Sequence, residues 1–153
     1  MEILRLAAAT VMLACGSIYL GTGVTLVFFL FPIQSKLTPA TYRVPFVEPV
    51  AAATRFLTPM TVVMLVATVG LIVLELGTAY WIAPAVYLVT TIASTLLTTR
   101  VIFRHNKRME AGIEDPAELQ ATLEAWRRLN TGRASLWAVQ WAAITTWFVV
   151  RAA

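Results

Sequence analysis

One helical face near the C-terminus of this 153-residue chain collects the side chains best suited to chemistry. Its members follow one another at intervals of four, three, four and three residues: Trp126, Asn130, Arg133, Trp137 and Gln140. Positions spaced in this way share one side of a helix. The guanidinium and the two amides need hydrogen-bond partners when they are buried, so this face predicts a polar site.

The residues of this face can also have purely structural roles in a membrane protein. Arg133 can lie at a membrane boundary and extend its charge into the head groups, with Trp126 and Trp137 in an interfacial aromatic belt. Gln140 lies deeper in the apolar run, where a single amide commonly bonds a neighbouring helix. Trp141 extends the aromatic part of the face.

Two titratable side chains can act as an acid or a base. His105 stands at the end of the third apolar run, and imidazole changes its charge near neutral pH. Glu48 lies between two prolines in the first connection, where it can instead form an exposed ion pair with a nearby arginine. Tyr19 can hydrogen-bond a substrate from the first apolar run. The hydroxyls of the third run, from Thr91 to Thr98, are expected to serve helix packing.

The composition identifies an integral membrane protein. The chain is 59% hydrophobic and 13% charged, with a mean hydropathy of +0.75. A soluble domain of this size could not bury so much apolar surface in one core, and disordered chains have a much lower apolar content. The net charge of +4 is explained by basic loops on one membrane face, and no basic patch with interleaved aromatics supports nucleic-acid binding. Cys15 and His105 are the only cysteine and histidine, so most zinc, haem and iron sites within one chain are excluded. We expect no metal and no cofactor.

The apolar runs approach the ~20 residues that a helix needs to cross a bilayer. They predict an all-α membrane protein, a single domain over residues 1–153, in which four transmembrane helices form an up-and-down bundle. The helices are expected at about residues 4–31, 59–76, 81–103 and 116–150.

The helix ends are predicted from prolines and caps. Pro32 is expected to end the first helix, and Thr58 resembles a cap for a second helix that starts at Pro59. An earlier start of that helix, with a kink at Pro59, is the alternative. Asp115 and the residues after it form a helix-start signal, and the fourth helix is long enough for its first half to extend into the cytoplasm.

The basic residues predict the orientation. All lysines and arginines except Arg5 and Arg151 lie in the first and third connections or at their helix flanks. The positive-inside rule then places both connections in the cytoplasm and both termini outside, with a bacterial inner membrane as the expected location.

The segment from Arg100 to Trp137 resembles the anthrone-oxygenase-like family of small four-helix membrane proteins. The shared pattern is an asparagine after the third helix, followed by a tryptophan, an asparagine and an arginine leading into the fourth, here Asn106, Trp126, Asn130 and Arg133. This chain departs from the family in placing Arg104 and His105 before the asparagine and in its tryptophan-rich fourth helix.

The resemblance implies an intramembrane pocket for a flat hydrophobic substrate, and named members are implicated in oxidising anthrones to anthraquinones during polyketide synthesis. The residues suit a cofactor-independent oxygenation or a base-catalysed cyclisation or isomerisation. In this hypothesis the base is His105 or Glu48, the oxyanion is held by Arg133, Asn130 and Asn106, and the substrate lies against Trp126, Trp137, Trp141, Gln140 and Tyr19.

Other hypotheses stay open. The chain can be a non-catalytic assembly subunit, a lipid- or ligand-binding protein, or a metalloenzyme that uses His105 with carboxylates. The expected partners are the lipid bilayer and a hydrophobic small molecule, and homo-oligomerisation is a further alternative.

Overall fold

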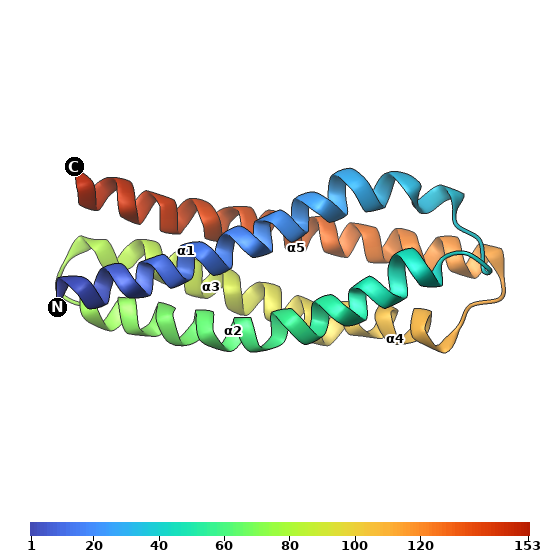
Figure 1. The fold of residues 1–153 in the computed structure, drawn as a ribbon, viewed down its shortest axis with the longest axis horizontal. Coiled ribbons are helices and arrows are strands. Elements are labelled where there is room, and N and C mark those ends of the chain that lie inside the picture. The colour runs from blue at the N-terminus through green and yellow to red at the C-terminus, as the bar shows by residue number, and fades with distance from the viewer.

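The computed structural model describes all residues from 1 to 153, and the ordered elements are all helical. Four long helical rods run along one axis, with the two termini at the same end (Figure 1). The first rod is α1 (Glu2–Thr25) with η1 (Leu26–Leu30) and η2 (Phe31–Lys36); the second is η3 (Arg43–Val47) with α2 (Glu48–Glu75); the third is η4 (Ala79–Trp81), α3 (Ile82–Leu97), η5 (Thr98–Ile102) and α4 (Phe103–Ala111); the fourth is α5 (Pro116–Ala152).

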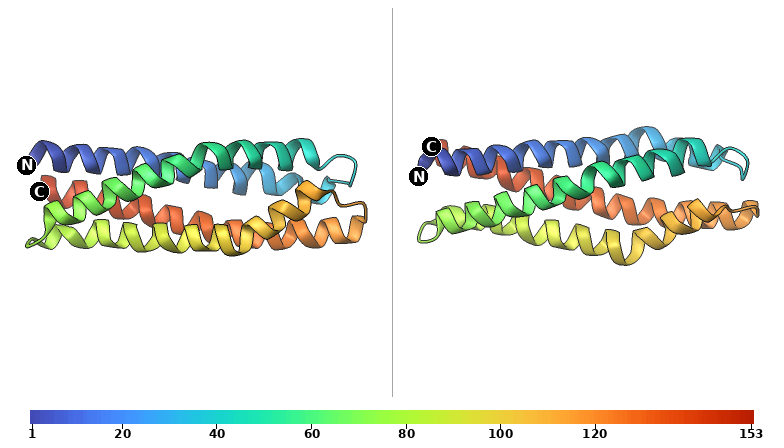
Figure 2. Two further views of the ribbon diagram at one scale, coloured as in Figure 1. Left: turned by 90° about the horizontal axis from the view of Figure 1, so that it is seen from below. Right: turned by 60° about the horizontal axis from the view of Figure 1, so that its bottom comes forward.

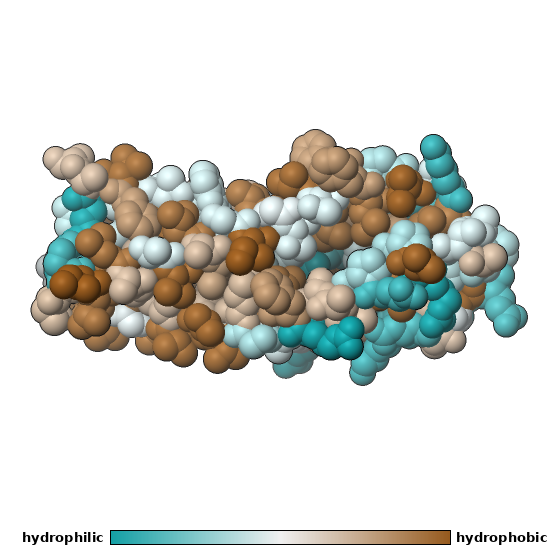
Figure 3. All heavy atoms as spheres, viewed as in Figure 1, coloured by the Kyte–Doolittle hydropathy of each residue, from teal (hydrophilic) through white to brown (hydrophobic).

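Three of the rods are long and apolar enough to cross a membrane, namely Glu2–Lys36, Arg43–Glu75 and Ala79–Ala111. The fourth rod is not among them, because tryptophans, threonines and Gln140 interrupt the apolar half of α5. Apolar side chains cover much of the visible surface, and hydrophilic ones gather toward the two ends, most of all at the end opposite the termini (Figure 3). These features support a membrane protein.

The second helix begins earlier than the sequence indicated. It starts at Glu48 and contains Pro59 in its interior, which corrects the start at Pro59 and matches the alternative of an earlier start. Pro49 lies in the first turn of α2, directly after the π-helical turn η3. Prolines that look like a connection therefore belong to a helix.

The first and third helices also extend beyond their predicted ends. Helical structure continues through Pro32 to Lys36, because that proline occupies the first turn of the 3-10 segment η2. The third rod continues through a π-helical turn, η5, and ends at Ala111.

The expected start of the fourth helix is confirmed. The Asp115 carboxylate accepts hydrogen bonds from the backbone N–H groups of Ala117 and Glu118, at 3.0 and 3.4 Å. From there α5 runs unbroken to Ala152. The turn after α2 contains Gly77 at φ +89°, as expected for a glycine that ends a helix.

The interior consists of two hydrophobic clusters. The first lies toward the termini and joins α1, α2, α3 and α5 through residues such as Met12, Tyr87 and Trp147. The second lies toward the long connections and is built around Trp126 and Phe46, whose rings meet edge to face. Between the two clusters the helices do not close completely, and this gap positions the candidate site.

At the end with the termini, four charged side chains link three helices. The Glu75 carboxylate is fully buried and accepts a hydrogen bond from Arg151 at 2.8 Å, with Arg5 at 3.8 Å. Glu2 contacts both arginines, Arg151 at 2.7 Å and Arg5 at 3.4 Å. The structure thus ties α1, α2 and α5 together through ion pairs that the sequence did not predict.

Candidate functional site

A cavity of about 730 Å³ lies between the two hydrophobic clusters. All four rods contribute to its wall, which includes residues of both clusters such as Met64 and Ile102. In both views of Figure 2, α2 lies beside α3 near the termini and diverges from it toward the other end. This divergence leaves the space that the cavity occupies.

Three π-helical turns border the cavity. Leu26 and Leu30 come from η1, Pro45 from η3, and Thr98 and Ile102 from η5. A π-turn inserts an extra residue into a helix and turns the following side chains to new directions, and such turns are frequent at functional sites. Sequence patterns based on the α-helical period do not predict them.

Arg133 is the only charged residue in the cavity wall. Its guanidinium lies over the ring of Trp137, 4.6 Å from the centroid, and donates to the hydroxyl of Thr98 at 3.2 Å and to the side-chain oxygen of Asn130. No carboxylate lies within ion-pair distance of it, and its buried Nε–H has no partner. The cavity therefore contains a positive charge that the protein does not neutralise.

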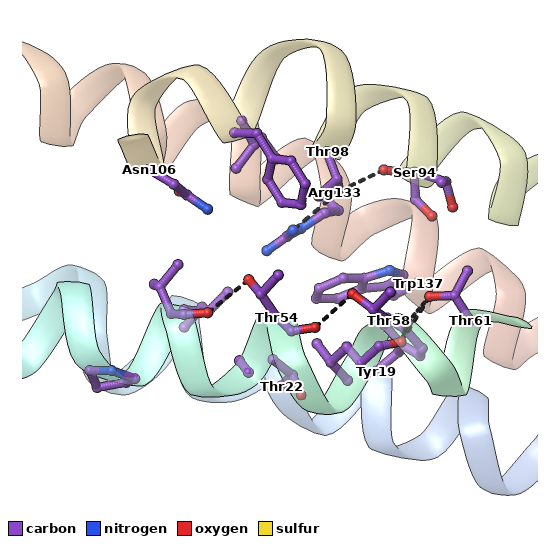
Figure 4. Close-up of a pocket in the computed structure, with 18 of the residues that line it drawn as sticks. Tyr19, Thr22, Thr54, Thr58, Thr61, Ser94, Thr98, Asn106, Arg133 and Trp137 are labelled. Carbon is purple, nitrogen blue, oxygen red and sulfur yellow. Dashed lines mark hydrogen bonds between the residues drawn. The ribbon is translucent and has the colours of Figure 1, made fainter. Parts of the chain in front are cut away.

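A short hydrogen-bond chain fixes the groups around this charge. The amide of Asn130, fully buried, donates to the carbonyl of Trp126 at 2.8 Å while its oxygen accepts from Arg133. The indole Nε1–H of Trp126 donates to Asn106 Oδ1, also at 2.8 Å. Because its oxygen is occupied, Asn106 directs its amide nitrogen into the cavity, toward the region that the Arg133 guanidinium also faces (Figure 4).

Hydroxyl groups line much of the remaining wall, and the sequence analysis did not select those of the second helix. The hydroxyl donors on the cavity face of α2 are bonded to carbonyls four residues earlier, as in Thr54, Thr58 and Thr61 (Figure 4). Their oxygens can still accept hydrogen bonds from a ligand. These threonines are spaced by four and three residues, and this spacing predicts that they share one helix face. Tyr19 also lines the cavity, with its hydroxyl 2.6 Å from that of Thr61.

Of the proposed site residues, five side chains line this one cavity. They are Tyr19, Asn106, Trp126, Arg133 and Trp137, and Asn130 supports them from behind.

The other two residues from the helical face lie elsewhere. Gln140 is fully buried and donates to the hydroxyl of Thr91, which is the interhelical role that its sequence position also allowed. Trp141 lies partly exposed and donates to Ser17 at 3.1 Å, outside the cavity wall.

Neither of the proposed bases lines the cavity. His105 precedes Asn106 on α4, and Glu48 precedes Pro49 on α2, but only their neighbours face inward. Successive helix positions are turned by ~100°, so adjacent residues point in different directions. Nowhere in the chain do three or more histidine, cysteine or acidic side chains come together as a metal site.

No protein-family model, curated protein or solved structure matches this chain.

Proposed function

We propose that this is an integral membrane protein in which four transmembrane helices form an up-and-down bundle. Three rods have the length and apolar character of spanning helices. The fourth packs against α1 and α3, so it would cross the bilayer with them. Large apolar side chains such as Phe28 and Val66, 67% and 68% exposed, would then face lipid.

We further propose that the cavity binds a hydrophobic small molecule through an anionic oxygen. The observation that carries this proposal is the Arg133 guanidinium, which faces a mostly apolar space without a carboxylate partner. An uncompensated charge in such surroundings is costly, and a charged group within a membrane protein commonly marks a functional site. An anionic ligand would supply the missing partner.

The neighbouring groups fit such a ligand. The free amide N–H of Asn106 and the guanidinium together offer donors to one oxyanion. A hydrogen bond to a charged group contributes about 1.5–3 kcal/mol, or roughly a 10- to 150-fold gain in affinity. The ring of Trp137 and the aliphatic wall would contact the apolar body of the ligand.

This binding proposal is tested by the molecules that remain bound through purification. Mass spectrometry of the full chain in mild detergent should detect a hydrophobic anion that is retained by the native protein and lost from Arg133→Gln. Arg128→Gln is the matched control, since Arg128 lies on the same helix but is 77% exposed and outside the cavity. Equal retention by native protein and Arg133→Gln would overturn the assignment.

A second candidate function is a tailoring enzyme that acts on an aromatic, polyketide-like substrate in the same cavity. The observation that favours it is the convergence of Arg133 and Asn106, which would stabilise an enolate or phenolate as it forms. The resemblance to anthrone oxygenases supports the same chemistry, in which an anthrone and dioxygen give an anthraquinone and water. Because His105 and Glu48 lie outside the wall, this candidate needs a substrate acidic enough to ionise without them.

Oxygen uptake with an anthrone distinguishes the two candidates. The enzyme hypothesis expects uptake that depends on Arg133 and that Arg128→Gln leaves unchanged. Saturable binding of the anthrone without oxygen uptake would support the binding function and contradict the enzyme.

A further inference from the structure

The cavity wall reaches the surface at more than one place: at Thr25 and Phe29 of the first rod, and between α2 and the third rod. Thr58 and Val62 on α2 and Thr99 on η5 belong to the wall and are nevertheless exposed at the surface, Val62 by 59%. α2 and the third rod are paired near the termini and diverge along the stretch that contains these residues (Figure 2). We call this gap, edged by Thr58, Val62 and Thr99, the lateral opening.

The lateral opening faces the part of the surface that would contact lipid. A bilayer core of ~30 Å corresponds to ~20 helical residues. Counted from the charged groups at the end with the termini, Glu75 on α2 and Arg151 on α5, this length ends near Arg55 and near Arg133. The guanidinium in the cavity would therefore lie at the level of the head groups on the side of the long connections, with the apolar part of the cavity in the hydrocarbon.

Positive charge is concentrated beside this opening. Arg55 is exposed, has no ion-pair partner, and lies on the same helical row as Thr58 and Val62. Arg100, which follows Thr99 directly, is also exposed and without an ion pair. An anion held in the leaflet would meet these arginines before it reaches Arg133, and such charges raise the local concentration of an anionic ligand.

We infer that the ligand reaches the cavity from within the bilayer, through the lateral opening. The ligand class is an amphiphile dissolved in the leaflet, with an apolar body and one anionic oxygen group. Its head group binds Arg133 and Asn106 while its body occupies the space between α2 and α3. This inference rests on the proposed binding function and adds the source of the ligand and its route.

The test blocks the opening without changing Arg133 or Asn106, the two groups that would hold the anionic oxygen. The full chain is reconstituted in phosphatidylcholine vesicles with spin-labelled stearic acid as the probe. Electron paramagnetic resonance then measures the immobilised fraction of the probe and its exchange with the mobile fraction. Val62→Trp places an indole at the opening, and Val66→Trp, one turn further on the lipid-facing surface and outside the wall, is the matched control.

We expect Val62→Trp to slow exchange at least tenfold, while Val66→Trp exchanges at the native rate and Arg133→Gln loses the immobilised fraction that the native protein shows. Thr58→Trp, at a second exposed position of the same edge, repeats the block in case Val62→Trp fails to fold. Native exchange rates in a folded blocking variant would overturn the lateral route and leave the binding function standing. An immobilised fraction that is the same in native protein and Arg133→Gln would overturn both.

Discussion

Two arginines of α5 both lie over an indole ring but differ in their charge partners. Arg133 stacks on Trp137 and Arg151 stacks on Trp147, with guanidinium-to-ring distances of 4.6 and 5.4 Å. Arg151 is neutralised by Glu75 and Glu2, at 2.8 and 2.7 Å. Arg133 has only neutral partners, a hydroxyl and an amide.

Under the proposed binding function, the difference separates a charge that is paired within the fold from one that is left for a ligand. At the end with the termini, the protein supplies both signs of charge and buries the Glu75 carboxylate beside two arginines. At the cavity, it supplies one sign and leaves the space beside it open. Removal of one member of a buried ion pair destabilises the fold because its partner is left uncompensated, whereas an unpaired buried charge would gain a partner only from a ligand.

The largest expected effect is at the paired end. Glu75→Ala leaves Arg151 and Arg5 without their buried partner, and removal of one member of a buried ion pair costs about 3 kcal/mol. We expect a markedly lower midpoint of thermal unfolding in detergent. Glu114→Ala, at an exposed carboxylate without an ion pair, is the control. By contrast, Arg133→Gln should leave the midpoint unchanged or raise it; a loss as large as that of Glu75→Ala would erase the distinction between the two arginines.

A smaller effect on stability is expected where α1 contacts the Trp137 ring beside the cavity. A Cβ at Gly23 would lie 3.1 Å from Ala134 and 3.2 Å from the Trp137 ring. Gly23→Leu should therefore push α1 away from α5, destabilise the protein by about 1–3 kcal/mol and weaken ligand binding.

Gly21 offers the matched control for this substitution, because no atom lies within 4 Å of the Cβ position there. Gly21→Leu should be neutral or slightly stabilising, since leucine favours a helix more than glycine does. Equal unfolding midpoints for the two variants would contradict a close contact between α1 and the Trp137 ring.

The orientation of Asn106 is expected to contribute a few-fold to affinity. Trp126→Phe keeps an aromatic ring but removes the N–H that occupies Asn106 Oδ1. Loss of one hydrogen bond of about 1 kcal/mol corresponds to roughly fivefold weaker binding of an anionic ligand, measured as a Kd in detergent. Trp141→Phe removes a hydrogen bond outside the cavity and should leave the Kd unchanged; an equal loss in both variants would contradict the positioning role.

The smallest expected effect on stability is at the ion pairs of Glu124 with Arg127 and Arg128, outside the apolar half of α5. Hydrogen bonds from Arg127 and then Arg128 lower the pKa of Glu124 to about 2, below its ordinary value. A carboxylate with a lowered pKa stabilises the folded state above the ordinary pKa, and this contribution disappears as the pH falls toward 2. Native protein should thus be slightly more stable than Glu124→Gln at pH 7, with the difference vanishing near pH 2. A difference that persists there would mean that the contacts of Glu124 are not ionic.

The sequence predicted the charged and part of the aromatic wall of the candidate site through one helical face. Trp126, Asn130, Arg133 and Trp137 lie on a single uninterrupted α-helix, so their spacing alone brought them to one side. The same spacing placed Gln140 on that side, but the cavity ends before it, and Gln140 meets α3 instead. Periodicity predicts which side chains share a face, not what lies opposite each of them.

The helix boundaries show a second limit of sequence patterns. Pro32 and Pro49 look like signals for loops, yet both lie in first turns of helical segments, where proline is tolerated. Pro59 remains inside α2, because packing of the surrounding helix outweighs the one backbone hydrogen bond that a proline removes.

The sequence by itself determined the helical class, the membrane character and the face that contains Arg133, because composition and periodicity depend only on the order of residues. Only the tertiary structure decided that Glu75 is neutralised and Arg133 is not, that Asn106 faces the cavity while His105 does not, and that α2 and α3 separate beside them. These outcomes depend on π-turns, helix divergence and contacts between residues far apart in the chain. No local pattern encodes which distant carboxylate a given arginine will meet.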